Sequence, residues 1–328
     1  MMNITPTKKL TVITGADGFI GSYLINYLNN RGYSDIIAVD VFKDEFSLKN
    51  LYKFKIKELV HKDDFLDWLI HNRKNVDVII HLGAISDTTV NDKDLLNEFN
   101  TEYTKQIWQY CSVFNLPLIY ASSAATYGDG KNGYDDDHNK VKELKPLNLY
   151  GKSKNDFDIW ALDQNATPLF WYGLKFFNVY GPFEQHKGKM ASVVYHAYNQ
   201  IKETGKMKLF KSYKDGIEDG YQKRDFIYVD DIAKIIEWLY SNKPENGIYN
   251  VGTGNARTFL DLVNATFKAM NIKPNIEFID MPDVLKDKYQ YFTEANMSKL
   301  LNAGYNNSFT DLEKGVLSYV NFLDKQNK

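Results

Sequence analysis

A short glycine-rich segment near the start of the chain constrains the fold more than any other feature. The apolar, β-branched run Leu10–Thr14 leads into Gly15, Gly18 and Gly21, which repeat at a three-residue spacing. The first glycine permits a tight turn, the second lets the backbone approach a pyrophosphate, and the third lets a helix pack closely on a strand. The N-terminus of that helix offers amide donors and a favourable dipole to a phosphate. The segment predicts a dinucleotide-binding turn, although a strand–helix turn that binds nothing would have the same local pattern.

Apolar strand-like runs alternate with helical patterns through the first half of the chain. The strand-like runs cover residues 35–40, 76–81, 116–122 and 169–177, and the helical patterns cover residues 19–31, 65–73, 94–114 and 150–164. This alternation predicts an α/β fold: a Rossmann-type, doubly wound parallel sheet covered by helices on both faces.

The second half of the chain has a looser pattern. Its strand-like pieces are short, at 207–210, 226–229, 248–251 and 276–279. We interpret this region as a smaller α/β substrate-binding domain, with some segments returning to the main sheet. The predicted dinucleotide-binding domain covers residues 1–176, 228–254 and 302–328, and the substrate-binding domain covers 177–227 and 255–301. Residues 213–222, which are acidic and contain glycine, predict a surface loop.

The composition argues against several classes of partner. The formal net charge of −2 gives no electrostatic footprint for nucleic acid or an anionic membrane. No apolar run approaches the roughly 20 residues that a membrane helix needs. The single cysteine, Cys111, excludes an intrachain disulfide framework and fits a reducing compartment. Six scattered histidines without a carboxylate or cysteine cluster predict no metal site. We therefore expect a cytoplasmic protein.

Asp40 lies at the end of the second strand-like run, nineteen residues after Gly21. An acid at this place accepts hydrogen bonds from the ribose of adenosine, and its charge disfavours a 2′-phosphate. Taken alone, Asp40 favours NAD over NADP. Lys43 or Lys62 would reverse that preference if either side chain reached the ribose.

Tyr150 and Lys154 form the pair that carries chemistry. Residues four apart on a helix share a face, so the phenol and the ammonium point into one site. A phenol with a pKa near 10 is a poor base at neutral pH, and a cation beside it lowers that pKa. Tyr150 would then take a proton from a substrate hydroxyl and later return it. Ser122 and Ser123 lie at the edge where open parallel sheets bind ligands, and a serine there can share that proton.

Together these motifs resemble the extended short-chain dehydrogenase/reductase family, also called the NAD-dependent epimerase/dehydratase family, over nearly the whole chain. The spacing to Tyr127 and Gly128 makes Ser123, and not Ser122, the counterpart of the family's catalytic serine. The resemblance implies one tightly bound dinucleotide per subunit, NADP or alternatively NAD, with Lys154 binding the nicotinamide ribose. The residues it implies around the dinucleotide are Gly15, Gly18, Phe19, Ile20, Gly21, Asp40, Val41, Lys62, Leu82, Gly83, Ala84, Ile85, Ser86, Asn100, Lys154 and Val179.

Segments of the second half, at 176–182, 186–192, 223–226 and 288–293, are similar to the branch of this family that epimerises ADP-linked heptoses, which are precursors of lipopolysaccharide. The resemblance implies a homo-oligomer, a homopentamer, and inversion of one carbon by transient oxidation. It makes Lys187 a second acid/base group beside Ser123, Tyr150 and Lys154. It implies that the ADP-sugar is bound by Asn178, Lys189, His196, Phe210, Lys211, Ser212, Arg224 and Tyr289.

Other interpretations remain open. The chain could be an epimerase for another nucleotide-sugar, such as a UDP-hexose 4-epimerase, or a catalytically silent dinucleotide-binding scaffold. It also departs from the family pattern, since Asp17 stands in the glycine turn, Phe183 replaces an arginine and Lys189 replaces a serine. These departures leave the exact sugar and the choice between NAD and NADP undecided.

Overall fold

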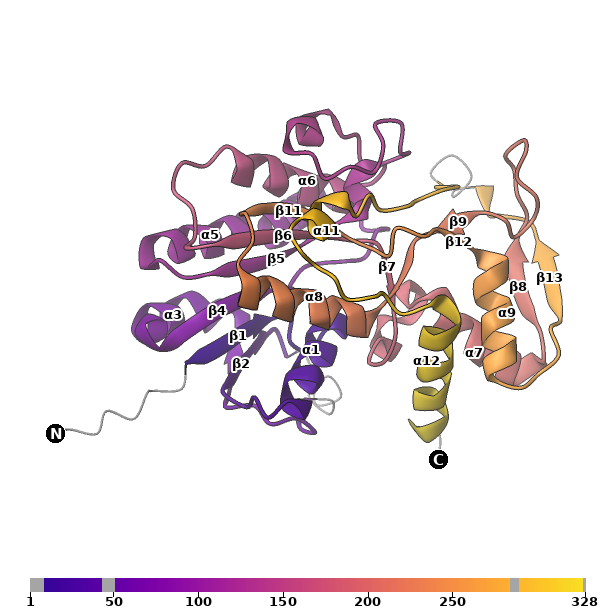
Figure 1. Ribbon diagram of the computed structural model, residues 1–328, viewed down its shortest axis with the longest axis horizontal. Coiled ribbons are helices and arrows are strands. Elements are labelled where there is room, and N and C mark those ends of the chain that lie inside the picture. The colour runs from indigo at the N-terminus through magenta and orange to yellow at the C-terminus, as the bar shows by residue number, and fades with distance from the viewer. Residues whose placement is uncertain (1–8, 43–50, 284–288, 327–328) are drawn as a thin grey trace.

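A computed structural model describes residues 9–42, 51–283 and 289–326, and it shows a large sheet with helices on both faces and a smaller part beside it (Figure 1). The large sheet has seven strands in the order β11-β6-β5-β4-β1-β2-β3, and every neighbouring pair is parallel. Its strands are β1 (Leu10–Thr14), β2 (Ile36–Asp40), β3 (Glu58–His61), β4 (Val76–His81), β5 (Leu118–Ser123), β6 (Trp171–Phe176) and β11 (Gly247–Val251).

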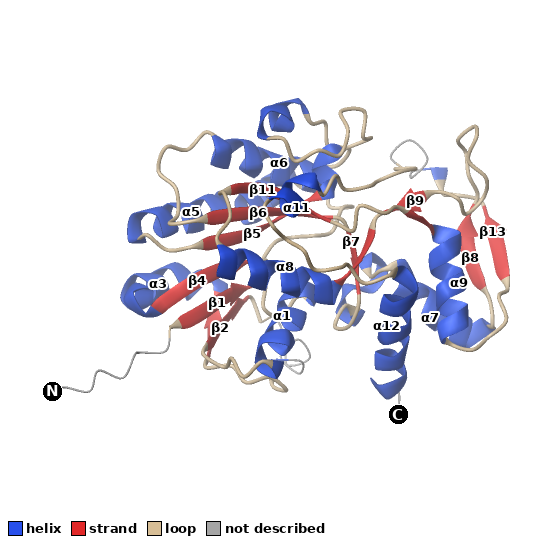
Figure 2. Cartoon of the chain, in the orientation of Figure 1, coloured by secondary structure: helices blue, strands red, loops and turns tan. Residues whose placement is uncertain are grey.

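Helices connect these strands and cover both faces of the sheet (Figure 2). They are α1 (Phe19–Asn30), α3 (Phe65–Asn72), α4 (Lys93–Leu96), α5 (Tyr103–Phe114), α6 (Leu149–Leu162) and α8 (Val229–Asn242). A π-helical stretch, Asn97–Glu102, joins α4 to α5, and 3₁₀ turns cover Lys62–Asp64, Arg73–Asn75, Ala124–Tyr127, His138–Glu143 and Gln185–Met190.

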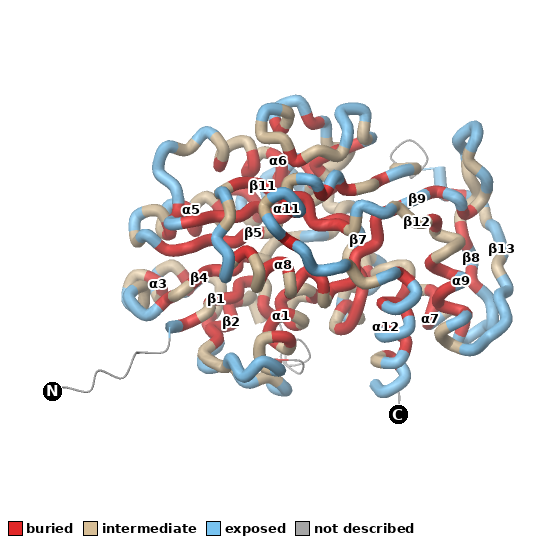
Figure 3. Tube along the Cα trace, viewed as in Figure 1, coloured by how far each residue is buried: buried red, intermediate tan, exposed pale blue. Residues whose placement is uncertain are grey.

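Two hydrophobic cores lie on the two faces of this sheet. In β2, Ile36 and Ala38 belong to a core that also holds side chains of α1 and α8. The alternate residues Ile37 and Val39 belong to a second core with side chains of α3, α5 and α6. A strand buried on both faces requires this pattern, because successive side chains point to opposite sides. Apart from the edge strand β3, the strands of the sheet are accordingly buried along most of their length (Figure 3). The predicted Rossmann-type, doubly wound parallel sheet is confirmed.

Among the described residues, the smaller part contains three two-stranded sheets and three helices. β8 pairs with β13 and β7 with β10 in parallel, whereas β9 pairs with β12 in antiparallel fashion. The elements are β7 (Asn178–Tyr180), β8 (Met207–Phe210), β9 (Lys223–Arg224), β10 (Phe226–Tyr228), β12 (Arg257–Thr258), β13 (Ile276–Ile279), α7 (Val193–Thr204), α9 (Phe259–Ala269) and α12 (Leu312–Gln326), and α11 (Ser298–Asn302) lies beside β11. Within the described ranges, no helix combines the length and the apolar character needed to cross a lipid bilayer.

The terminal helix α12 packs on the smaller part. Its buried residues, including Val316 and Val320, share a third core with Val194 of α7 and with Leu262 and Val263 of α9. The sequence-based domain division places residues 302–328 in the dinucleotide-binding domain. The packing instead groups α12 with α7 and α9, and the other predicted domain boundaries stay a proposal.

The segment between β5 and α6 covers the exposed edge of the main sheet at β11. Asp136 Oδ2 accepts a hydrogen bond from the Asn250 amide at 2.7 Å, and His138 Nε2 accepts one from the Ile248 amide at 3.0 Å. These amides belong to an edge strand, whose unpaired donors would otherwise invite pairing with another chain. This segment therefore closes this edge of the sheet.

Replacing Gly21 with alanine should destabilise the fold although alanine is the better helix former. A Cβ at Gly21 would stand 2.1 Å from the Gly15 carbonyl oxygen, so the turn would have to move. We expect a loss of roughly 1–3 kcal/mol in the free energy of unfolding, as for other overpacked sites.

Gly205→Ala is the matched control. Its φ is +70° and no atom lies within 4 Å of the added Cβ, so only backbone strain of about 1 kcal/mol is introduced. Urea unfolding of both variants measures the difference. A smaller loss for Gly21→Ala than for Gly205→Ala would contradict the packing described for this turn.

Candidate active site

The candidate site lies along the carboxyl ends of the main strands. Open parallel sheets bind ligands where the strand order reverses. Here that point lies between β1 and β4, because the chain runs from β1 through β2 to β3 and then crosses back to β4. The glycine turn after β1, the loop after β4 and the turn after β5 therefore meet at one edge.

The glycine turn has the shape that a pyrophosphate needs. Gly15 has a φ of +67°, and a Cβ there would stand 2.6 Å from the Gly83 nitrogen, so the ends of β1 and β4 nearly touch. Helix α1 begins after Gly18 without a side-chain cap and without an acidic residue in its first turn. Its first amides therefore remain available to an anion. The residues present fit a bound dinucleotide.

Asp40 supports the same turn from the end of β2. Its Oδ2 accepts a hydrogen bond from the Asp17 amide at 3.0 Å, and its Oδ1 accepts one from the Val41 amide at 2.8 Å. Each carboxylate oxygen keeps a further lone pair, so a ribose hydroxyl can still bind there. Asp17, which departs from the family pattern of this turn, thus contributes a backbone donor that fixes Asp40.

Lys62 begins the turn after β3, and β3 lies beside β2 in the sheet. Its Nζ lies 2.7 Å from Asp63 and 4.7 and 4.9 Å from the ring centroids of Phe99 and Tyr103. The ammonium is therefore held near the end of β2 where an adenosine ribose would lie. Lys43, the other lysine considered from the sequence, falls outside the described residues.

Asn100 holds the loop after β4 rather than pointing into open space. Its Oδ1 accepts from the Ile85 amide at 2.8 Å, and its Nδ2 donates to the Ile85 carbonyl and to Ser153 Oγ, both at 3.0 Å. Asn100 is 1% exposed. The side chain therefore links loop 82–86 to helix α6, and direct contact with a dinucleotide stays a prediction.

His81 is a buried neutral side chain whose tautomer follows from its partners. Thr104 Oγ1 donates to the Asn100 carbonyl at 2.7 Å, so it accepts from His81 Nε2–H at 3.0 Å. His81 Nδ1 then accepts from Thr14 Oγ1 at 2.6 Å, and Thr14 Oγ1 accepts from the Gly83 amide at 3.2 Å. Burial, and secondarily the positive charge of Lys154, lowers the pKa of His81 to about 3. The neutral imidazole fixes Gly83 against the glycine turn.

Ser123 and Tyr150 are brought together by two well-defined local structures. Ser123 ends β5, and its Oγ accepts from the Ala125 amide at 3.1 Å, which starts a 3₁₀ turn. Asn148 caps α6, since its Oδ1 accepts from the Gly151 amide at 2.7 Å. A Cβ at Gly151 would stand 2.7 Å from the Ala125 carbonyl oxygen, so the helix start and the serine turn are in close contact.

The pKa of Tyr150 differs in direction from the sequence-based expectation. Burial raises it, and a hydrogen bond with Ser123 opposes that shift. Lys154 is 4% exposed, donates to the Ala121 carbonyl at 2.9 Å, and has its own pKa lowered by burial to about 8. The expected net lowering of the Tyr150 pKa is therefore wrong, because desolvation of the phenol outweighs the effects that oppose it.

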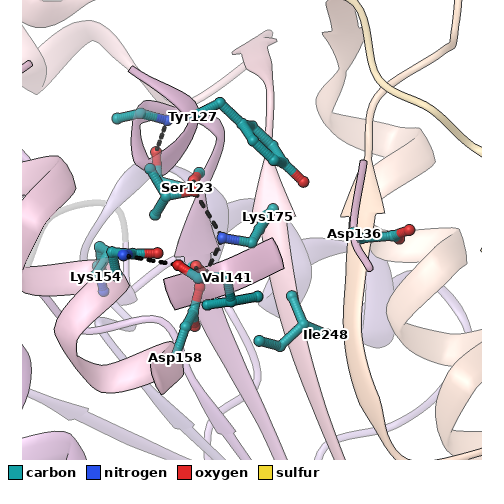
Figure 4. Close-up of polar contacts among 12 residues, drawn as sticks. Ser123, Tyr127, Asp136, Val141, Lys154, Asp158, Lys175 and Ile248 are labelled. Carbon is teal, nitrogen blue, oxygen red and sulfur yellow. Dashed lines mark hydrogen bonds and ion pairs between the residues drawn. The ribbon is translucent and has the colours of Figure 1, made fainter. Parts of the chain in front are cut away.

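The sequence analysis missed a buried ion pair directly behind these residues. Lys175 of β6 and Asp158 of α6 are both 0% exposed, and Lys175 Nζ lies 2.9 Å from Asp158 Oδ2 (Figure 4). Ser122 Oγ donates to the same carboxylate oxygen at 2.6 Å, which leaves Ser123 as the serine that faces Tyr150. A lysine inside the apolar run 169–177, and an aspartate four residues after Lys154, were the signals that could have revealed the pair.

Lys187 lies in a loop that Glu184 closes. Glu184 is 1% exposed and accepts from the Ser192 amide at 2.6 Å and from Ser192 Oγ at 2.5 Å. Lys187 Nζ lies 5.7 Å from the ring centroid of Phe19 at the start of α1. Burial lowers the pKa of Lys187, and the charge of Glu184 opposes this shift. Among the described residues, the contacts of Lys187 are with Phe19 and this loop, so its pairing with Tyr150 stays a prediction.

Arg224 is buried in the smaller part, between two aromatic rings. Its guanidinium carbon lies 5.3 Å from the ring centroid of Tyr289 and 5.5 Å from that of Phe259. It donates to the carbonyls of Lys223, at 2.9 Å, and Gln290. The structure thus joins the predicted residues Arg224 and Tyr289, and the guanidinium has donors left for an anion because it carries five N–H groups.

The remaining predicted residues have less specific settings. His196 Nε2 lies 3.3 Å from the Lys189 carbonyl oxygen, so these two are neighbours. Lys211 forms an ion pair with Asp280 at 3.1 Å and is partly exposed. The others are placed by their elements and by a few contacts: Ile20 lies in α1; Leu82, whose amide donates to the Thr14 carbonyl at 3.1 Å, and Ala84 and Ser86 follow β4; Asn178 and Val179 lie in β7; Phe210 ends β8; and Ser212 follows β8, where its amide donates to Asp219 Oδ1 at 2.6 Å.

Known proteins match this chain along nearly its whole length. The sequence profile of the NAD dependent epimerase/dehydratase family matches residues 11–252. The ADP-L-glycero-D-manno-heptose-6-epimerase of Fusobacterium nucleatum is 47% identical over an alignment that covers 97% of this chain and 99% of that protein. The crystal structure of the Helicobacter pylori ADP-L-glycero-D-manno-heptose-6-epimerase matches with a TM-score of 0.80 at 28% identity, covering 97% of each chain. A UDP-N-acetylglucosamine 4-epimerase from Methanobrevibacter ruminantium matches with a TM-score of 0.81 at 22% identity, covering 98% of this chain and 99% of that chain, and so shares the fold.

Replacing His81 with glutamine should reduce the loss of unfolding free energy that occurs as the pH falls below 6.5. The folded-state pKa of His81, about 3, lies below the unfolded value of 6.5, so the stability from the neutral imidazole is complete above pH 6.5 and is lost as the pH falls toward 3. Between pH 6.5 and 5.0 the wild type should lose about 2 kcal/mol more than the variant, since one pKa unit is about 1.4 kcal/mol.

Urea unfolding of both proteins at these two pH values measures that difference. Glutamine keeps one donor and one acceptor but does not titrate in this range. Parallel curves for the two proteins would show that His81 is not the buried neutral group described here.

Proposed function

The chain belongs to the NAD dependent epimerase/dehydratase family, and we propose that it inverts C6 of the heptose in ADP-D-glycero-D-manno-heptose to give ADP-L-glycero-D-manno-heptose. One observation carries the proposal: a relative named for this activity matches the chain from end to end. The contact between Ser123 and Tyr150, beside a turn that fits a dinucleotide, supports it further.

The trio Ser123, Tyr150 and Lys154 supplies the proton chemistry of this reaction. A bound nicotinamide dinucleotide supplies an acceptor, and later a donor, for a hydride. Tyr150 accepts the proton of the C6 hydroxyl, while Ser123 hydrogen-bonds the same oxygen and fixes its position. Lys154, whose pKa of about 8 leaves it mainly charged at neutral pH, supplies a cation that favours the phenolate state of Tyr150 against the cost of burying it. Proton and hydride both return to the sugar, so the reaction needs no external oxidant.

Inversion requires a second proton-transfer group on the opposite face of the carbon. Lys187 is our candidate, because burial lowers its pKa toward the working range of a general acid or base. Glu184 anchors the loop that carries it and limits the shift of that pKa.

The ADP-sugar would lie between the main sheet and the smaller part. Arg224 has free donors for the diphosphate, and Tyr289 lies against it. We assign Asn178, Lys189, His196, Phe210, Lys211 and Ser212 to the rest of the pocket, as the family resemblance implies. The same resemblance supports a cytoplasmic homopentamer that provides a precursor of lipopolysaccharide.

We further propose NADP as the cofactor. Asp40 favours NAD by its charge, which its hydrogen bonds from two backbone amides do not remove. Lys62 lies near this end of the sheet and offers a cation to a 2′-phosphate. NAD remains the alternative, since the family is described as NAD dependent.

A UDP-hexose 4-epimerase is the second candidate. The fold does not separate the two, because a UDP-N-acetylglucosamine 4-epimerase matches it equally well. The higher identity to the heptose epimerase, over nearly the whole chain, favours the first candidate. A silent dinucleotide-binding scaffold is disfavoured by the intact catalytic trio.

Turnover on a panel of nucleotide-sugars tests the proposed substrate. The purified chain should interconvert the two ADP-heptose epimers, with kcat/KM for UDP-glucose and UDP-N-acetylglucosamine lower by roughly 100-fold or more. Faster epimerisation of a UDP-hexose would establish the second candidate, and no turnover on any sugar would favour the scaffold.

Removing either acid/base group should stop epimerisation without preventing binding. Tyr150→Phe and Lys187→Met should each lower kcat by roughly 10²–10⁴-fold, because general acid–base catalysis contributes that much. Lys206→Met, an exposed lysine after α7, is the control and should keep normal turnover. Wild-type kcat in Tyr150→Phe would refute the catalytic trio, and wild-type kcat in Lys187→Met would show that Lys187 is not the second acid/base group.

Mass spectrometry of denatured protein identifies the cofactor. NADP should be released, because a cofactor that is regenerated in each turnover need not leave. Lys62→Met should lower the affinity for NADP by roughly tenfold or more and leave that for NAD unchanged, since it removes one charge-assisted contact. Release of NAD alone, with no effect of Lys62→Met, would overturn the assignment.

A further inference from the structure

The ion pair between Lys175 and Asp158 lies at the junction of all three catalytic residues. Lys175 comes from β6, which is the neighbour of β5 in the sheet. Asp158 comes from α6, one helical turn after Lys154 and two turns after Tyr150. Both side chains are 0% exposed, so water does not compete for their contacts.

On one side, the pair fixes helix α6 to strand β5. Asp158 Oδ1 accepts from the Tyr120 hydroxyl at 3.1 Å, and its Oδ2 accepts from Ser122 Oγ at 2.6 Å. The helix that carries Tyr150 and Lys154 is thereby attached to Tyr120 and Ser122, which precede Ser123 in β5.

On the other side, the pair fixes the backbone of Ser123 itself. Lys175 Nζ donates to Thr126 Oγ1 at 2.7 Å, and Thr126 Oγ1 donates to the Ser123 carbonyl at 2.8 Å. Thr126 is 0% exposed, and the Tyr127 ring centroid lies 5.1 Å from the ammonium. In Figure 4 the Lys175 side chain accordingly stands between Asp158 and the turn that begins at Ser123.

We propose that Lys175, Asp158 and Thr126 are positioning residues that hold the Ser123 hydroxyl at a fixed place relative to Tyr150 and Lys154. The three link β5, β6 and α6 through one continuous chain of contacts: Asp158, Lys175, Thr126 and the Ser123 carbonyl. All three side chains are 0% exposed and so act through Ser123 and helix α6 rather than by contact with a substrate. This inference rests on the proposed function for its kinetic test, but not for its structural one.

A purely stabilising role would not require this arrangement. Well-packed apolar residues of similar volume are often as stabilising as a buried ion pair, because each charge loses its hydration on burial. What apolar residues lack is direction: a charged pair with hydrogen bonds on both sides sets the distance between the elements that it joins. The role of the pair is therefore to set the geometry of the reacting groups.

Thr126 offers the cleanest test, because it can be changed without leaving a buried charge unpaired. Thr126→Val keeps the shape and removes the hydroxyl, while Lys175 keeps its partner Asp158. Thr126→Ser keeps the hydroxyl and is the matched control. Since misplacement of about 1 Å can lower a rate by about 10²-fold, we expect kcat on ADP-heptose to fall by about 10- to 100-fold in Thr126→Val with KM unchanged. Thr126→Ser should retain kcat within about threefold.

Equal kcat in Thr126→Val and wild type, or equal losses in both variants, would overturn the inference. Crystal structures of the two variants with bound dinucleotide test it independently of the sugar. The Ser123 hydroxyl should move away from the Tyr150 hydroxyl in Thr126→Val and stay in place in Thr126→Ser. An unmoved serine in both would refute the positioning role even if the wild type proved inactive on ADP-heptose, which by itself would refute only the proposed function.

Discussion

The close approach of two backbones at the ends of β1 and β4 is the constraint on which the site depends. Gly15 and Gly83 leave no room for a Cβ between them, and this contact brings the glycine turn and the loop after β4 to one edge of the sheet. Asp40 and Asn100 then hold these segments through backbone amides, and the neutral imidazole of His81 holds them through the Thr14 hydroxyl. The surface that would receive a dinucleotide is consequently fixed by buried hydrogen bonds before any ligand arrives.

The electrostatics of the catalytic trio follow from the same burial. Desolvation raises the pKa of Tyr150 and lowers that of Lys154, so in the absence of ligands the phenol is a poor base. Lys154 is buried, so a bound charge near its ammonium is only weakly screened by water. This arrangement suits a catalyst that exchanges a proton only when substrate and cofactor are both in place.

Much of the fold and part of the site could be predicted from the sequence. The parallel sheet followed from the alternating pattern, apart from β3, which the pattern did not predict, and the turn followed from its three glycines, because both depend on local periodicity and spacing. The packing of α12 on α9 could not be predicted, since an amphipathic helix does not reveal which surface covers its apolar face.

The errors at the site have a similar origin. The Lys175–Asp158 pair joins residues 17 positions apart on different elements, and nothing in their spacing links them. The direction of the Tyr150 shift was missed because the spacing of Tyr150 and Lys154 shows a shared helix face but not how deeply the phenol is buried. Sequence motifs identified the reacting groups, whereas their environment required the structure.

The most direct test of the account follows the hydrogen on C6. ADP-D-glycero-D-manno-heptose labelled with deuterium at C6 should be epimerised in ordinary water with the label retained in the product, because the hydride leaves and returns without exchanging with solvent. Products that carry solvent hydrogen at C6 would show that the carbon is deprotonated instead, and would contradict inversion by transient oxidation at this site.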